Sequence, residues 1–222
     1  MDKMADLRIY DPAKCAVFCK TKERYGGNSN MAAGFPLRVN NVKILTSEAL
    51  YQACRFPLYP EIQKKIISQK SPMTAKMVGK PYRKTSNRED WELIHVTLMK
   101  WCLRVKLLQN WTSFSQVLLE TGDLSVVEFS TKGDDFWGAV LVKEIEFSNK
   151  KTKKRSPKYQ PSVEMPAGFL VGYNVLGRLI QELRENVKAG IDTMSRNFTR
   201  LAPLPIENFL LLGEAIKEIL RS

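Results

Sequence analysis

The spacing of hydrophobic residues predicts a set of amphipathic helices joined by a few short strands. Across residues 88–109, apolar side chains recur at alternating spacings of three and four, as they do on the buried face of a helix. Asn87 is the expected cap of this helix. The same spacing predicts a second long helix over residues 176–187, with Gly190 beyond its end. Each of these helices should bury one face against the rest of the chain.

Shorter elements are delimited by prolines, glycines and small polar residues. Proline at the first position of a helix and glycine after its last one form a common pairing, and Ser or Thr followed by Glu or Gln three residues later forms a capping box. Three further helices are expected: over residues 61–69, from the cap Ser71 to Gly79, and from a capping box of Ser113 and Gln116 to Gly122. Strands are expected within residues 16–19, 36–45, 124–130 and 169–171.

These elements predict a fold that is mainly α with a small β-sheet (α+β). A chain of 222 residues is long enough for one domain with a proper core. We expect this domain to cover residues 1–190, with a polar, basic insertion at residues 143–166. Residues 191–222 form a C-terminal extension. Its run FLLL at 209–212 is too apolar for a free tail, so it should pack on the domain or on a partner.

The composition is that of a soluble globular protein, with 44% hydrophobic and 26% charged residues. No apolar run approaches the roughly 20 residues that a membrane-spanning helix needs, and no leader opens the chain. The four cysteines are scattered and His95 is the single histidine. We therefore expect a cytoplasmic protein with free thiols, no metal, no cofactor and no membrane partner.

The net charge of +12 carries information about partners. Residues 150–155 form a block of like charges, KKTKKR. Such a block is often a solvated loop, because its members repel one another. Clustered lysines and arginines also bind nucleic-acid backbones without reading their sequence. Since a positive excess remains outside this block, we favour a nucleic-acid or nucleotide substrate. The predicted phosphate-contacting residues are Lys150, Lys151, Lys153, Lys154 and Arg155.

One acidic residue stands at the start of a predicted helix. In residues 46–56, Ser47 can cap the helix and Glu48 falls in its first turn. The helix dipole favours a negative charge there, so we expect Glu48 to stay ionised. The alternative to a functional role for Glu48 is an ordinary helix start with an acidic first turn.

A series of short motifs resembles the NADAR family of YbiA-like N-glycosidases over residues 17–187. The motifs, in order, are GGNSN at 26–30, SPMTA at 71–75, DW at 90–91, LRVK at 103–106, DDFWG at 134–138, GYNVLG at 172–177 and ELRE at 182–185. The resemblance implies a single domain of mainly helical architecture and cleavage of a bond between a ribose carbon and a nitrogen.

Further motifs look like one branch of this family, the NADAR antitoxins paired with DarT-type toxins. They are FPL at 35–37, LTSEALYQ at 45–52, WCLRVK at 101–106 and FLLLGE at 209–214. The resemblance implies removal of ADP-ribose from the guanine amino group of DNA, and hence toxin neutralisation and phage defence. ADP-ribosylated DNA and a DarT-type toxin are the implied partners.

The implied reaction passes through an oxocarbenium-like state, which a carboxylate near the anomeric carbon stabilises. Glu48, Glu128 and Asp134 are the acids in matching motifs, although Glu128 could be paired and Asp134 could brace a turn. Lys106 matches a family lysine and lies beside the apolar stripe, where a desolvated amine becomes a nucleophile. It could equally extend its stem along the core and pair with an acid. Lys76 is the alternative nucleophile.

Glycine-bearing loops and nearby polar residues are the candidates for substrate binding. Glycines let backbone amides approach phosphates, an asparagine can hold a ribose hydroxyl, and a tryptophan can stack on a base. Turn asparagines are more often structural. The predicted substrate-binding residues are Arg24, Gly27, Asn30, Arg55, Trp137, Gly172 and Asn174.

Two other functions stay open at this stage. One is an N-glycosidase for a small phosphorylated metabolite, such as an intermediate of the riboflavin pathway, for which the basic insertion would be irrelevant. The other is a non-catalytic module that binds ADP-ribose or the toxin. The presence of all four candidate catalytic residues argues against this last function.

Overall fold

The computed structural model describes residues 6–142, 168–190 and 199–221. The predicted nucleic-acid-binding cluster between Lys150 and Arg155 lies outside the described residues, together with the whole basic insertion at residues 143–166. The predictions that rest on this cluster therefore stay predictions.

Helices dominate the described part of the chain. They are α1 (Ser47–Ala53), α2 (Pro60–Ile67), α3 (Pro72–Gly79), α4 (Trp91–Gln109), α5 (Trp111–Leu119) and α6 (Val175–Gly190). Short 3₁₀ helices are η1 (Pro12–Lys14), η2 (Gly26–Asn28) and η3 (Lys80–Lys84).

The strands are short and form several small sheets. Strand β7 (Leu170–Gly172) pairs in antiparallel fashion with β1 (Arg8–Tyr10) and β6 (Val140–Leu141). The remaining pairs are β2 (Cys15–Phe18) with β5 (Ser125–Glu128), β3 (Leu37–Val39) with β4 (Val42–Ile44), β8 (Arg200–Leu201) with β11 (Ile219–Leu220), and β9 (Leu210–Leu211) with β10 (Glu214–Ala215). The predicted α+β class is confirmed, with one three-stranded sheet and four two-stranded ones among the described residues in place of one small sheet.

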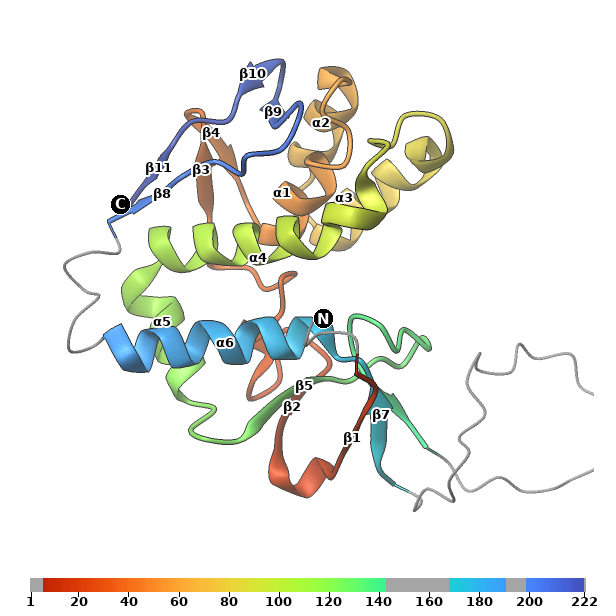
Figure 1. Cartoon of the computed structure of the whole chain (residues 1–222), viewed down its shortest axis with the longest axis vertical. Coiled ribbons are helices and arrows are strands. Elements are labelled where there is room, and N and C mark those ends of the chain that lie inside the picture. The colour runs from red at the N-terminus through yellow and green to blue at the C-terminus, as the bar shows by residue number, and fades with distance from the viewer. Residues whose placement is uncertain (1–5, 143–167, 191–198, 222) are drawn as a thin grey trace, which may run out of the picture.

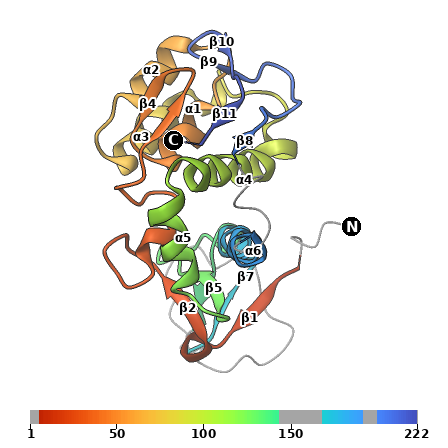
Figure 2. The ribbon, with the colours of Figure 1, turned by 90° about the vertical axis from the view of Figure 1, so that its left-hand side faces the viewer.

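Helix α4 lies between two groups of elements (Figure 1). Helices α1, α2 and α3 lie on one side of it with β3, β4 and the C-terminal strands. Helices α5 and α6 lie on the other side with β1, β2, β5 and β7, and the view turned by 90° shows the same division (Figure 2). A helix in this position contacts both groups, so its side chains can link them.

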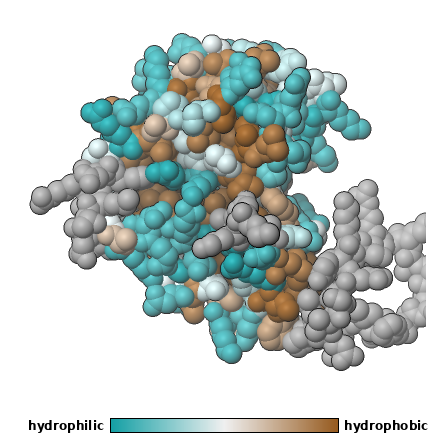
Figure 3. Space-filling model, in the orientation of Figure 1, coloured by the Kyte–Doolittle hydropathy of each residue, from teal (hydrophilic) through white to brown (hydrophobic). Residues whose placement is uncertain are grey.

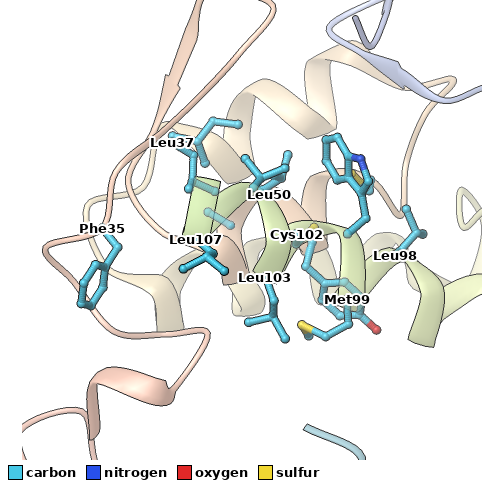
Figure 4. Packing of buried hydrophobic residues seen from close by; sticks show 14 of the residues in the cluster. Phe35, Leu37, Leu50, Leu98, Met99, Cys102, Leu103 and Leu107 are labelled. Atoms are coloured by element: carbon cyan, nitrogen blue, oxygen red, sulfur yellow. The ribbon is translucent and has the colours of Figure 1, made fainter. Parts of the chain in front are cut away.

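The apolar stripe of α4 forms the centre of the core (Figure 4). Leu98, Leu103 and Leu107 are fully buried along it, and Leu50 of α1 and Leu37 of β3 meet them. Burying one such side chain stabilises the fold by about 1.5–3 kcal/mol. On the surface seen in Figure 3, hydrophobic patches alternate with hydrophilic side chains, as is usual for a globular protein.

Three predicted helix starts are wrong. Helix α4 begins at Trp91, since the Arg88 backbone N–H donates to Arg55 O (3.0 Å) and the Arg88 side chain binds Asp90. Thr46 caps α1, accepting a hydrogen bond from Ala49 N (3.2 Å). Helix α5 already begins at Trp111, so the expected capping box of Ser113 and Gln116 lies inside the helix.

Residues 199–221 pack on α2 and α4. The Trp101 side chain donates to Ala202 O (3.0 Å), and its ring meets Phe209 edge-on, with centroids 4.9 Å apart. Gln63 of α2 donates to Leu210 O (3.0 Å) and accepts from Leu212 N (2.6 Å). This segment therefore covers the outer face of both helices.

Lys106 of α4 is a fully buried lysine. Its ammonium donates to Gly27 O (2.8 Å) and Ser29 O (3.1 Å), and it lies 3.9 Å from the ring centroid of Phe114 and 4.4 Å from that of Phe35. Burial lowers the pKa of this amine. Two carbonyls and two rings thus replace water around it, and they tie the loop 26–29 to α4.

We predict that Lys106→Met lowers the free energy of unfolding by about 2–4 kcal/mol, because two buried carbonyls lose their donor. Urea unfolding measures the change. The matched control on the same helix is Lys100→Met, which removes an exposed ion pair with Glu182 and should change stability by less than about 1 kcal/mol. Equal effects of the two substitutions would contradict a bracing role for Lys106.

Candidate active site

The loop that Lys106 holds is followed by Asn30, which contacts Glu48 at the start of α1. The Asn30 carbonyl accepts from Glu48 N (3.0 Å) and from Ser47 Oγ (2.9 Å). The Asn30 side chain donates back to the Glu48 carboxyl group. Asn30 therefore fixes both the backbone and the side chain of Glu48.

A second amide completes the surroundings of Glu48. Gln52, one turn further along α1, donates through Nε2 to Glu48 Oε1 (2.9 Å), and its own oxygen accepts from Arg83 Nη2 (3.2 Å). Both carboxyl oxygens are thus bound by amide donors, which orients the group.

The expectation that the helix start keeps Glu48 ionised is not supported. Glu48 is only 2% exposed, and burial raises its pKa even though Lys76, Gln52, Arg83 and Asn30 oppose the shift. A helix terminus contributes about 0.3–1 kcal/mol, whereas removing a carboxylate from water costs several kcal/mol. Burial is the larger effect.

Glu48 lines a cleft of about 560 Å³. Glu128 and Asp134 line the same cleft, so the three acids predicted from the sequence lie together. Lys76 of α3 lies near both Glu48 and Glu128, close enough to lower the pKa of each. The cleft therefore holds carboxyl groups and an amine at one place, as acid–base or nucleophilic chemistry requires.

Glu128 stands at the end of β5. Burial raises its pKa to about 7, with contributions from the negative charges of Asp134 and Glu48. Its backbone N–H donates to Asn174 Oδ1 (3.0 Å), which holds the end of the strand. A carboxyl group with a pKa of about 7 can both donate and accept a proton near neutral pH.

Asp134 is exposed at the rim of the cleft. Its carboxylate accepts from Trp137 N (3.0 Å), so it also braces the turn that carries Trp137. The Trp137 ring lines the cleft and meets Tyr51 edge-on, with centroids 5.9 Å apart. Together these two rings give the cleft an aromatic wall.

The structure brings most of the predicted site residues together. The predicted residues that line the cleft are Asn30, Glu48, Arg55, Lys76, Glu128, Asp134 and Trp137. Lys106 does not line it. Its ammonium points to carbonyls behind the loop, so the position does not fit the predicted attack on an anomeric carbon.

Four predicted substrate-binding residues lie elsewhere. Asn174 is buried, with its side chain bound to Glu128 N and to Val126 O (2.9 Å), so it braces β5. Gly172 belongs to β7, where a Cβ would stand 2.3 Å from Gly138 O. Arg24 is exposed over the Tyr25 ring. The Gly27 carbonyl accepts a hydrogen bond from Lys106.

Other cleft residues carried little signal in the sequence. Gln52 is four residues after Glu48, a spacing that places both side chains on one helix face, and this could have identified it. Arg83 reaches the cleft from η3. Tyr51 fits the apolar pattern of α1, from which a core position is expected. Met99 lines the cleft from the buried stripe of α4. Tertiary packing alone brings the last three residues here.

We predict that Glu128→Gln stabilises the protein above neutral pH. The carboxyl pKa rises from 4.5 to about 7 on folding, so the folded state holds the proton more tightly. The wild type then loses stability as the pH rises through this interval, by up to about 3 kcal/mol, whereas the neutral amide does not. Urea unfolding between about pH 4 and 9 tests this, with exposed Glu61→Gln as control. Parallel pH curves for wild type and Glu128→Gln would contradict it.

Two features are absent from residues 6–142, 168–190 and 199–221. No group of three or more His, Cys, Asp or Glu side chains is placed to hold a metal ion. No helix there is both long and apolar enough to cross a membrane.

Comparisons with known proteins fit this architecture. The solution structure of YbiA from E. coli is similar, with a TM-score of 0.57 and 27% identity over 82% of this chain and 88% of that one. A riboflavin biosynthesis protein of Vibrio vulnificus (strain YJ016) is 37% identical over 93 residues, which are 42% of this chain and 24% of that protein. The match thus spans about a quarter of that relative. The NADAR domain model matches residues 17–188, so the chain belongs to the NADAR family, which includes N-glycosidases.

Proposed function

We propose that this protein is an N-glycosidase that removes ADP-ribose from the guanine amino group of ADP-ribosylated DNA. It would thereby act as the antitoxin of a DarT-type toxin in phage defence. The observation that carries the proposal is the meeting of Glu48, Glu128 and Lys76 in one cleft. A volume of about 560 Å³ is in the range of small-molecule sites, about 300–1,000 Å³.

Each group has a role that its surroundings support. Glu128, with a pKa of about 7, gives a proton to the leaving nitrogen and later takes one from water. Glu48 is held by two amides and faces the positive charge that develops on the ribose. Trp137 and Tyr51 offer ring surfaces to the base.

Lys76 takes the nucleophilic role that the sequence assigned first to Lys106. The neutral form of its amine attacks the anomeric carbon and displaces the guanine nitrogen, which takes a proton from Glu128. Opening of the ribose ring then gives an iminium, and water hydrolyses this to free ADP-ribose and the amine. Attack by water itself, assisted by an acid of the cleft, is the alternative mechanism.

The choice of substrate rests on charge and resemblance. Arg55 and Arg83 line the cleft beside the carboxyl groups, and a diphosphate needs such cations. The net charge of +12 favours a polyanion. The motifs shared with the DarT-associated branch favour ADP-ribosylated guanine.

A second substrate has its own support. The Vibrio vulnificus relative is named a riboflavin biosynthesis protein, and the cleft also fits a small phosphorylated metabolite. Hydrolysis of such a metabolite, with no action on modified DNA, would favour this alternative. Binding of ADP-ribose without any release would instead favour a non-catalytic module.

We predict that the protein releases ADP-ribose from an oligonucleotide that carries ADP-ribosylated guanine. Chromatography of the released sugar nucleotide measures the rate. Glu48→Gln keeps the shape of the side chain but removes its charge, so turnover should fall by about 10²-fold or more while substrate binding persists. Exposed Glu61→Gln is the matched control and should turn over at the wild-type rate. Unchanged turnover in the Glu48 variant would exclude its proposed role.

We predict that borohydride added during turnover traps a covalent adduct on Lys76. Peptide mass spectrometry locates the modified residue. The adduct should be absent from Lys76→Met and present in the exposed control Lys64→Met. An adduct on Lys106 would restore the first assignment, and turnover by Lys76→Met without an adduct would establish attack by water.

A further inference from the structure

We infer that Arg55 and Arg83 form a subsite for a phosphate group of the substrate, and that Gln52 links this subsite to Glu48. The inference deepens the proposed function and rests on it for the identity of the reaction. It concerns the cationic part of the cleft, which the chemistry of Glu48, Glu128 and Lys76 does not use.

The two arginines reach the cleft from different elements. Arg55 follows α1, and its guanidinium lies over the Trp91 ring, 3.7 Å from the centroid. Arg83 belongs to η3 and lines the same cleft. Burial and the nearby charge of Arg83 lower the pKa of Arg55 to about 10, so the Arg55 guanidinium still carries its charge at neutral pH. Two like charges are thus held close together at one site.

The arginines also keep unused hydrogen-bond donors. The Nε atoms of Arg55 and Arg83 are buried and have no hydrogen-bond partner. Arg55 contacts the Tyr51 hydroxyl, and Arg83 contacts Gln52. Across residues 6–142, 168–190 and 199–221, neither forms an ion pair. Both arginines thus line the cleft without a carboxylate of the described residues at salt-bridge distance, so an anion that enters the cleft would meet two cations that no ion pair neutralises.

A phosphate or diphosphate is the anion that suits this arrangement. The planar fork of a guanidinium binds phosphate oxygens in pairs, and two such forks match a group that presents several oxygens. The carboxyl oxygens of Glu48 are already bound to Asn30 and Gln52. An external anion is therefore the group that can neutralise the two guanidinium groups.

Gln52 connects this subsite to the reacting end of the cleft. A guanidinium can only donate, so the Gln52 oxygen must face Arg83 and its nitrogen must face Glu48. The amide is thus locked by its two partners. A phosphate that fixes Arg83 would therefore also fix Gln52, and through it the Glu48 carboxyl group. Gln52 is a positioning residue in this arrangement.

Calorimetric titration with inorganic pyrophosphate tests the subsite. Arg55→Gln and Arg83→Gln should each weaken binding by about tenfold or more, as expected for loss of a charge-assisted bond. Arg8→Gln removes an exposed arginine on β1 and should leave the affinity within about twofold. Inorganic phosphate in a parallel titration distinguishes a single phosphate from a diphosphate as the preferred group. Equal affinity of all variants would overturn the subsite.

The link through Gln52 has a separate test. Gln52→Met should bind pyrophosphate within about threefold of the wild type but turn over substrate at least about tenfold more slowly. Because Gln52 and Arg83 both lower the pKa of Glu48, the acid limb of the kcat profile should move to higher pH in Gln52→Met and in Arg83→Gln. Retained pyrophosphate binding shows that the Gln52 variant is folded, and the Arg83 variant gives the same readout if it is not. An unmoved acid limb in both would overturn the link.

Failure of this inference can be separated from failure of the proposed function. Release of ADP-ribose with an unchanged KM in both arginine variants would leave the glycosidase and remove the subsite. Pyrophosphate binding that depends on both arginines, without release of any base or sugar, would leave the subsite and remove the glycosidase.

Discussion

The arrangement of the cleft depends on one buried ammonium. Lys106 binds the carbonyls of Gly27 and Ser29 from within the core, and the next residue, Asn30, holds Glu48 by its carbonyl and its side chain. The loop at residues 26–29 is thereby fixed to α4, whose apolar stripe forms the centre of the core. Among the described residues, the partners of the Lys106 amine are backbone oxygens and aromatic rings, and no acidic side chain pairs with it.

Around this anchor, the cleft separates its charges. Glu48 and Glu128 lie where burial raises their pKa values, and Glu128 reaches about 7. Arg55 and Arg83 lie beyond Gln52, which binds one partner of each sign. Such a division suits a substrate with a neutral sugar bond at one end and an anionic group at the other. The aromatic pair of Tyr51 and Trp137 supplies a wall for a flat ring.

The sequence by itself determined the elements whose signal is local. The stripe of α4 and that of α6 follow from apolar spacing, and Pro72 with its cap Ser71 marks the start of α3. The motifs predict that Glu48, Glu128 and Asp134 belong to one site, and all three line the cleft. Each is adjacent to a helix start, a strand end or a turn that local residues encode.

Only the tertiary structure decided which contacts those residues form and how their pKa values shift. The position of Lys106 beside the apolar stripe predicted a lysine at the edge of the core, but only packing shows that its amine faces the loop and not the cleft. Arg83 comes from a 3₁₀ helix about thirty residues from Gln52 along the chain. The Asn174 side chain forms its hydrogen bonds with the backbone of β5. Burial raises the pKa of Glu48, whereas the helix start alone predicts that it is lowered. Desolvation depends on every neighbour in space, and this quantity is not contained in the spacing of residues along the chain.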